Sequence, residues 1–126
     1  MSIALKEANS RSLIILDEFG QGTSPVDGSA IFISIMEHWM CQGNESPLIL
    51  AATHLHGAAS YLSRPELALN ARFMSMRYTL QDGSLIFLYE PEDGLCGNSF
   101  PFSVAQAAGM PEFVVQRGQE VRITIF

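Results

Sequence analysis

Cysteine and basic residues are scarce in this sequence. Its 126 residues include two cysteines, Cys41 and Cys96, and seven lysines and arginines against thirteen acidic residues. Two cysteines are too few for a disulfide framework, and their spacing is not that of metal ligands. The net charge of −6 comes without a basic cluster, which argues against a nucleic-acid-binding face on this chain. We therefore expect a protein of a reducing compartment.

Long hydrophobic runs are also missing. No stretch reaches the roughly 18 uninterrupted apolar residues of a membrane helix, and residues 1–12 lack the apolar run of a secretory signal. Apolar material is nevertheless ample, at 48% of residues against 16% charged, which suits a packed core. We expect an intracellular chain that forms one globular domain or part of one.

The first half of the sequence alternates strand-like and helix-like segments. Helical spacing predicts a short helix over 2–9, and continuous apolar runs predict strands at 12–16 and 47–53. The first strand does not alternate with polar residues, which is typical of a parallel strand covered on both faces. Together with the helix between them, the strands predict a βαβ unit with a right-handed crossover.

The helix between the two strands is expected to be largely buried. Asp27 is the expected N-cap after a loop over 20–25, and Gly43 is placed to stop the helix. Its polar residues form one narrow stripe, and apolar residues cover most of the remaining circumference. These apolar residues are Ile31, Phe32, Ile35, Met36, Trp39 and Met40.

The second half predicts a hairpin and then helices. Alternation in the second half of 71–80, a turn signal at 81–83 and the apolar run after it predict a β-hairpin. A helix over 103–108 is expected to end at Gly109, and Pro111 suits the first turn of a final helix.

Two adjacent carboxylates, Asp17 and Glu18, end the first predicted strand, and His54 follows the second. Ligands bind at the carboxyl ends of parallel strands in open α/β sheets, so these groups can converge. Adjacent carboxylates repel each other, which indicates that the pair binds a cation or takes up a proton. Phosphoryl transfer fits this pattern: one carboxylate holds magnesium or its water, the other activates the attacking water, and the histidine senses the terminal phosphate.

The acidic pair carries one geometric condition. Neighbouring residues on a regular strand point to opposite faces, so both carboxylates serve one site only if the backbone turns at Glu18. Gly20 would ease that turn. A bare acidic pair is most simply the start of a solvated loop. The apolar run before it, the Gly-Thr-Ser loop and the Ala-Thr-His after the next strand favour a site instead.

Three segments resemble the MutS family of DNA mismatch-recognition ATPases. The segment LIILDEFGQGTSPVDG resembles its Walker B strand and D-loop, LAATH its switch-histidine strand, and DGLCGNSFPFSVAQAAGMP its C-terminal element. They occur in the family's order and cover nearly the whole chain. AQAAGMP with QRGQEV is more similar to the meiotic MutS-homologue branch than to the bacterial repair protein.

The resemblance implies a role for each matching residue. Asp17 would serve magnesium through water, Glu18 would activate the attacking water, and His54 would read the γ-phosphate. The loop that communicates across a dimer would consist of Gly22, Thr23, Ser24 and Asp27. Ser99 would lie with Phe100 near the partner subunit, and it joins Asp17 and the loop residues in the nucleotide-binding set.

The same resemblance implies an architecture and partners. The fold would be α/β, a partial P-loop NTPase (ABC-type) parallel sheet with flanking helices, a β-hairpin and a C-terminal helical element. Residues 1–126 would be the C-terminal portion of the ATPase domain, with 99–126 as a dimerisation element. The implied cofactors are ATP and magnesium. The implied partners are a second MutS-homologue subunit, in a homo- or heterodimer, and DNA that binds through other regions of the parent protein. No membrane is implied, and the location is nuclear in a eukaryote and cytoplasmic otherwise.

Some residues depart from the family's pattern. No G-x-x-x-x-G-K-[ST] loop occurs in the chain, so the backbone cradle for phosphates and its lysine are missing. Pro101 replaces a small residue, and the tail RITIF is apolar where the family continues a polar helix. We expect a truncated gene product or an imperfect gene model, inactive alone, whose longer parent is a DNA-dependent ATPase.

Three other hypotheses remain open. The chain fits a non-catalytic dimerisation or docking fragment, because it lacks the phosphate loop. Another ABC-type ATPase is disfavoured by Gly-Gln-Gly-Thr after the acidic pair and by the C-terminal Ala-Gly-Met-Pro. A metal-dependent hydrolase would combine His54 and His56 with the acidic pair, although His-x-His alone is a weak signal.

Overall fold

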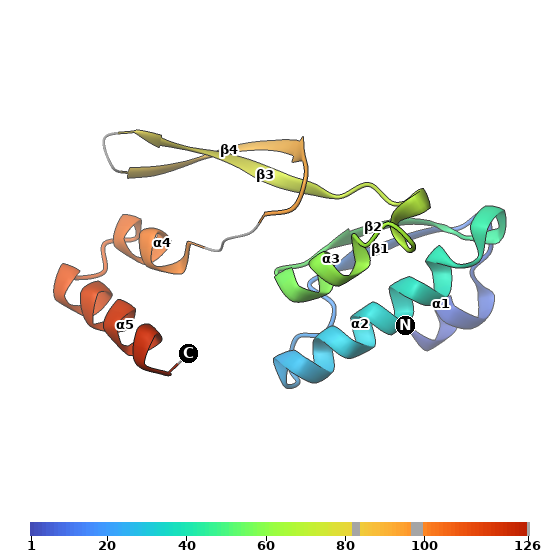
Figure 1. The fold of residues 1–126 in the computed structure, drawn as a ribbon, viewed down its shortest axis with the longest axis horizontal. Helices are drawn as coiled ribbons and strands as arrows, with labels where there is room; N and C mark the ends of the chain where they lie inside the picture. The colour runs from blue at the N-terminus through green and yellow to red at the C-terminus, as the bar shows by residue number, and fades with distance from the viewer. Residues whose placement is uncertain (82–83, 97–99, 126) are drawn as a thin grey trace. The chain divides into compact units, whose positions relative to one another are not determined.

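The computed structural model describes residues 1–81, 84–96 and 100–125. It divides into two compact units, with unit 1 made of residues 1–74 and 93–95, and unit 2 of the described residues in 75–92 and 96–126. The fold is mixed α/β, with one two-stranded parallel sheet and a second two-stranded sheet among the described residues (Figure 1).

Unit 1 contains the predicted βαβ arrangement. Its elements are α1 (Ser2–Glu7), β1 (Leu13–Asp17), α2 (Pro25–Met40), β2 (Leu48–Ala52) and α3 (His56–Leu62), with 3₁₀ turns at Gly43–Glu45 and Ala68–Asn70. Strands β1 and β2 pair in parallel, from Leu13 opposite Leu48 to Asp17 opposite Ala52. The prediction of two parallel strands around a helix is therefore confirmed, and both strands end at the same edge.

Helix α2 begins three residues earlier than a cap at Asp27 would place it. Ser24 is the N-cap: its Oγ accepts from the backbone N–H of Asp27 at 3.2 Å and donates to Asp27 Oδ2 at 2.8 Å. Pro25 occupies the first turn, where its missing N–H is not needed. The assignment of Asp27 as the N-cap was wrong, because Ser24 and Asp27 form a reciprocal capping pair with the carboxylate inside the helix.

The end of α2 also differs slightly from the expectation. The helix ends at Met40 with Cys41 as its C-cap, and Gly43 lies in the following turn with a φ of 55°. Gly43 therefore permits the turn into the 3₁₀ segment and does not itself terminate α2.

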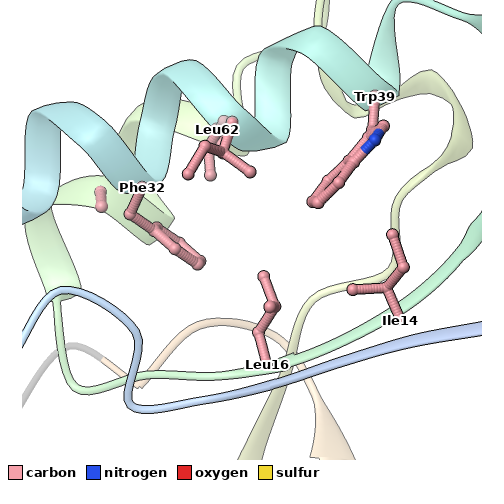
Figure 2. Packing of buried hydrophobic residues seen from close by; sticks show 7 residues of the cluster. Ile14, Leu16, Phe32, Trp39 and Leu62 are labelled. Atoms are coloured by element: carbon pink, nitrogen blue, oxygen red, sulfur yellow. The ribbon is translucent and has the colours of Figure 1, made fainter. Parts of the chain in front are cut away.

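The core of unit 1 lies between α2, α3 and one face of the sheet. Figure 2 shows Phe32 and Trp39 from α2 and Leu62 from α3 directed toward Ile14 and Leu16 of β1. Trp39 is only 1% exposed, which confirms its predicted core position. The remaining buried members of the cluster are Ile35 and Ala58, and residues of α1 also pack against it.

The sheet of unit 1 is covered on one face, which corrects the expectation that the first strand, β1, is covered on both. Burial alternates along β1, with Ile14 and Leu16 inside and Leu13 and Ile15 60% and 66% exposed. Leu48 and Leu50 of β2 are similarly exposed. All the helices that contact this core do so through the face that carries Ile14 and Leu16. Within the described part of unit 1, the apolar residues of the second face therefore meet no covering helix.

Helix α2 is likewise buried along one stripe and not around most of its circumference. Its buried positions are Gly28, Phe32, Ile35 and Trp39, whereas Ile31 is 50% exposed. Met36 and Met40 are partly buried against the core. This spacing places a single apolar stripe against the sheet and α3.

Unit 2 consists of a strand pair and two helices, as predicted. Strands β3 (Met74–Gln81) and β4 (Ser84–Asp93) pair in a sheet of their own; residues 82–83 of the predicted turn lie outside the described residues. Helix α4 (Pro101–Ala107) starts at Pro101, which suits a first helical turn. Gly109 follows its end with a φ of 86°, and the amide of Met110 bonds to the carbonyl of Ala105 at 3.0 Å as in a Schellman C-cap.

Helix α5 (Glu112–Ile125) packs closely on α4. A Cβ on Gly118 would lie 2.9 Å from Cε1 of Phe102, so a glycine allows this approach. Val115 is buried. The apolar tail, through Ile125, continues this helix. The departure from the family noted above is therefore one of composition, and the segment is still helical.

Replacing Trp39 by alanine tests the core of unit 1. We expect the Trp39→Ala variant to lose about 3–5 kcal/mol in the free energy of unfolding, because a large buried side chain is replaced by a cavity. Urea unfolding followed by far-UV circular dichroism measures this loss. Ile31→Ala on the same helix is the control, and equal unfolding midpoints for the two variants would contradict the assigned core.

Candidate functional site

The backbone turns sharply where β1 ends. Glu18 has a φ of 50°, a left-handed conformation that is uncommon for residues other than glycine. Its amide still continues the sheet by bonding to the carbonyl of Ala52 at 2.9 Å. The turn required for Glu18 to leave the strand's alternation is therefore confirmed. Gly20 and Gly22 follow with φ values of 97° and 89°, which glycine adopts without strain.

The loop after Glu18 is pressed against the first turn of α2. A Cβ built on Gly28 would lie 2.6 Å from the carbonyl oxygen of Gly20, and one on Gly20 would lie 3.1 Å from the carbonyl oxygen of Gly28. Only glycine fits at Gly28 without moving backbone atoms. This close approach fixes where the loop between β1 and α2 runs.

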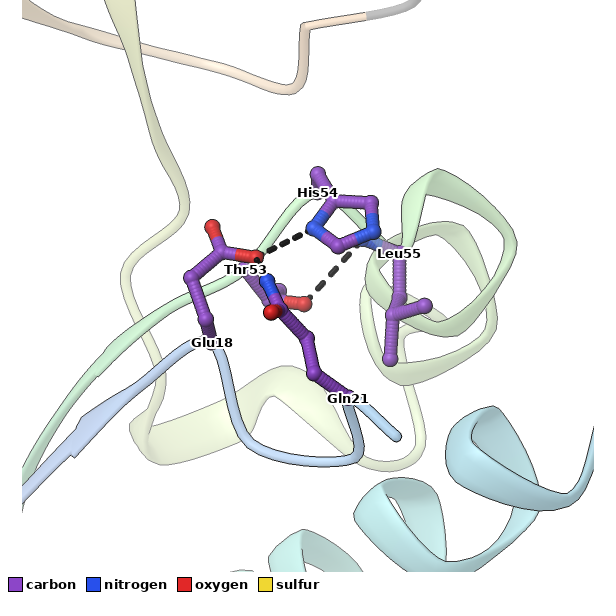
Figure 3. Close-up of polar contacts among 5 residues, drawn as sticks. All are labelled: Glu18, Gln21, Thr53, His54 and Leu55. Atoms are coloured by element: carbon purple, nitrogen blue, oxygen red, sulfur yellow. Dashed lines mark hydrogen bonds and ion pairs between the residues drawn. The ribbon is translucent and has the colours of Figure 1, made fainter. Parts of the chain in front are cut away.

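Glu18 and His54 meet at the shared edge of β1 and β2. Nδ1 of His54 contacts Oε2 of Glu18 in a hydrogen bond and ion pair that spans 36 residues of sequence (Figure 3). The segment that carries His54 is held locally, because the amide of Leu55 bonds to Oγ1 of Thr53 at 3.1 Å and that of His56 to the carbonyl of His54 at 2.9 Å. The expectation that the strand ends bring these two side chains together is confirmed.

Gln21 is part of this cluster and was not among the predicted site residues. Its Nε2 donates to Oε2 of Glu18 at 2.7 Å, the same oxygen that His54 contacts. The sequence alone gives no signal for this contact, because a polar residue in a loop is common. Only the left-handed backbone at Glu18 allows the residue three positions later to return to the carboxylate.

Hydrogen bonding keeps the Glu18 carboxyl ionised. The amide of Gln21, and next the imidazole of His54, lower the pKa of Glu18 below its ordinary value. Because the pKa is lower in the folded state, the ionised group contributes stability above the unfolded-state pKa. That contribution is lost as the pH falls through the folded-state pKa.

The other predicted site residues are distributed around this cluster. Asp17 is the exposed last residue of β1. Gly22 and Thr23 line a hollow of about 340 Å³ together with Gln21 and His54. Ser24 and Asp27 are engaged with each other at the start of α2.

One of the two predicted partner-facing residues, Phe100, is described and belongs to unit 2. Ser99 lies outside the described residues. Phe100 contacts Tyr78 edge to face, with ring centroids 4.6 Å apart. Its proximity to a partner subunit stays a prediction.

The side chains of the site fit magnesium better than a protein-ligated metal centre. Among the residues that the structure describes, no group of three or more His, Cys, Asp or Glu side chains could hold a metal ion. The hydrolase hypothesis built on His54 and His56 therefore has no support from the geometry. Magnesium needs only one or two carboxylates beside water and phosphate oxygens, and Asp17 offers an exposed carboxylate of that kind.

Comparison with known families decides the identity of this arrangement. A family model described as MutS domain V matches residues 1–125. The chain belongs to the MutS domain V family. The acidic strand end, the glycine-rich loop and His54 are thus features of a MutS domain.

The relatives of this MutS domain include bacterial DNA mismatch repair proteins MutS. That of Dinoroseobacter shibae is 38% identical over 124 residues, covering 96% of this chain and 13% of the relative. That of Dehalococcoides mccartyi is 37% identical over 120 residues, covering 93% and 13%, and that of Lawsonia intracellularis 35% over 115 residues, covering 91% and 12%. The chain spans about an eighth of the length of these relatives.

No helix that the structure describes in this MutS domain combines the length and apolar character needed to cross a bilayer.

Substitution of Gly28 tests the close approach between the loop and α2. We expect Gly28→Ala to lower the free energy of unfolding by about 1–3 kcal/mol, because the added methyl displaces the Gly20 carbonyl. Amide chemical shifts of residues 20–23 should move with it. Gly57→Ala in α3 is the matched control, since nothing lies within 4 Å of its Cβ, and a helical alanine is favoured by up to about 1 kcal/mol. Equal effects of the two substitutions would refute the contact.

Proposed function

We propose that this chain supplies the water-activating and phosphate-sensing side of an ATP-hydrolysing site in a MutS-type DNA mismatch repair protein. In this proposal β1 and β2 are two strands of a P-loop-type sheet. ATP is the substrate, and the phosphate-binding loop, which this sequence does not contain, comes from outside it.

The observation that carries the proposal is the Glu18–His54 pair. A carboxylate and an imidazole from separate strands meet at the carboxyl edge of a parallel sheet, which is where α/β proteins bind ligands. The left-handed backbone at Glu18 adds weight, since strained conformations cluster at functional sites. Membership of the MutS domain V family agrees with this location.

Glu18 has the chemistry of a general base in this reaction. Its carboxylate takes a proton from water while the water oxygen attacks the γ-phosphorus. The bond between that phosphorus and the β–γ bridging oxygen breaks, and ADP leaves with the bonding electron pair. Glu18 is ionised at neutral pH, which is the form that accepts the proton, and its hydrogen bonds to Gln21 and His54 lower its pKa further.

His54 presents its two ring nitrogens to different groups in the proposed site. Its Nδ1 contacts the Glu18 carboxylate, which leaves Nε2 as the nitrogen that can meet a phosphate oxygen. In the proposed site His54 thus links Glu18 to the γ-phosphate.

Asp17 is the proposed magnesium residue, acting through water. When bound, the ion would neutralise charge on the phosphate oxygens. Gly22 and Thr23 lie at the hollow beside His54, which suits contact with nucleotide or with a neighbouring subunit. Ser24 and Asp27 would act there through the start of α2, and Ser99 completes the proposed set.

The longer assembly is proposed from family membership. A second MutS-homologue subunit would face the loop over 20–25, the segment 99–126 would contribute to the dimer, and DNA would bind through regions outside this chain. The meiotic branch, and with it a nuclear location, stays a prediction from AQAAGMP and QRGQEV, whereas the relatives reported above are bacterial proteins.

A chimera tests the role of Glu18. Residues 1–125 of this chain replace the matching segment of the Dinoroseobacter shibae MutS, which supplies the rest of a MutS protein. We expect the chimera to hydrolyse ATP, and the Glu18→Gln form to keep its affinity for ATP while kcat falls by about 100-fold or more. Phosphate release and nucleotide binding measure the two quantities.

Glu66→Gln, at an exposed glutamate of unit 1, is the matched control for charge removal and should leave kcat unchanged. An inactive chimera, or turnover that survives Glu18→Gln, would count against the proposed function.

The chain by itself should not turn over ATP. Because no phosphate-binding loop is present in its 126 residues, we expect phosphate release by the purified chain to equal the buffer background. Turnover that disappears on Glu18→Gln would contradict this expectation and would show that the loop is dispensable.

A further inference from the structure

Gln21 contacts the acidic site, and neither the residue pattern nor the family resemblance gives it a role. We propose that Gln21 is a positioning residue: its amide and His54 together hold Oε2 of Glu18, which leaves Oε1 as the oxygen that takes the proton from the attacking water. The inference rests on the proposed function of Glu18 and adds to it a residue and a specific atom.

The turn after β1 is what brings Gln21 back to Glu18. The backbone N–H of Gln21 bonds to the carbonyl of Glu18 at 3.4 Å, which closes a tight turn through the left-handed Glu18 and Gly20. The side chain then extends in the same direction, and its Nε2 lies 2.7 Å from Oε2 of Glu18. Gln21 therefore reaches the carboxylate as a consequence of the local backbone.

Two donors on one oxygen distinguish the two oxygens of the carboxylate. Each carboxylate oxygen offers two lone pairs, and the N–H groups of Gln21 and His54 both use Oε2 (Figure 3). A further donor such as water then meets Oε1. The last torsion of a glutamate is broad and roughly two-fold, so a carboxylate with one donor exchanges its oxygens more freely than one held by two.

An amide suits this task because it donates without adding charge. Besides Glu18, the titratable side chains contributed by the elements that form the site are Asp17 at the end of β1, Asp27 in the first turn of α2, His54 after β2, and His56 and Tyr61 in α3. Gln21 stays neutral at every pH at which these groups titrate. The Gln21 amide can therefore hold the Glu18 carboxylate in place and leave His54 available to contact a phosphate oxygen.

Titration of Glu18 in the 126-residue chain, without nucleotide, tests the contact. The δ-carbon resonance of Glu18 is followed by NMR against pH and is identified by its loss in Glu18→Gln. Gln21→Met keeps the length of the side chain and removes its donor, so we expect the pKa of Glu18 to rise. Gln42→Met is the matched control, because it removes an amide that lies 3.0 Å from His38 elsewhere in unit 1, and it should leave the pKa of Glu18 unchanged.

Restoring a donor separates positioning from packing. Gln21→Lys should bring the pKa of Glu18 back to the wild-type value or below it, because a long cationic donor replaces the amide. An unchanged pKa in Gln21→Met, or no recovery in Gln21→Lys, would overturn the proposal. The indole signal of Trp39 reports in each variant that the core is intact, and a variant that shifts the titration only by losing that signal counts against the proposal.

Failure here is distinguishable from failure of the proposed function. In the chimera, Gln21→Met should lower kcat and leave KM for ATP unchanged, because Gln21 acts through Glu18 and not on the nucleotide. A shifted titration with an unchanged kcat would overturn the positioning role alone. Turnover that survives Glu18→Gln would overturn the proposed function, while the titration would still report whether Gln21 holds the carboxylate.

Discussion

Parallel pairing of β1 with β2 is the constraint on which the site depends. Strands that run in the same direction end at the same edge, so residues 36 positions apart in sequence become neighbours without any long loop reaching across. The buried cluster formed by β1, α2 and α3 holds that pairing in place. The left-handed residue at the end of β1 then redirects one carboxylate toward the histidine.

Hydrophobic periodicity was enough to predict most of the fold. The two parallel strands, the helix between them, the hairpin and the two last helices all occur close to the expected residues. Two details were wrong, each for its own reason. The N-cap was placed at Asp27 because an acidic residue suits that position, but Ser24 offers the better-spaced partner. The continuous apolar run in β1 was interpreted as burial on both faces. A continuous apolar run does not indicate which face of the strand the helices of the chain cover.

The site was predictable where it depends on strand ends and not where it depends on a turn. Asp17, Glu18 and His54 were predicted because each stands at the end of an apolar strand, and the resemblance to the MutS family pointed to the same residues; the contact between Glu18 and His54 is confirmed. Gln21 was missed because its contact exists only after the chain reverses at Glu18. The roles assigned to Gly22, Thr23 and Ser99 depend on groups outside this chain, so no pattern or contact within it could decide them.

The open face of the β1–β2 sheet affects how this chain behaves in an optical assay. Leu13, Ile15, Leu48 and Leu50 present aliphatic side chains to solvent in the folded state. Dyes such as ANS fluoresce on exposed apolar surface, and their binding is commonly taken as the mark of a molten globule. On this chain a fully native core would also bind the dye. The environment of Trp39, buried beneath the opposite face of the sheet, is therefore the better indicator of whether the chain is folded.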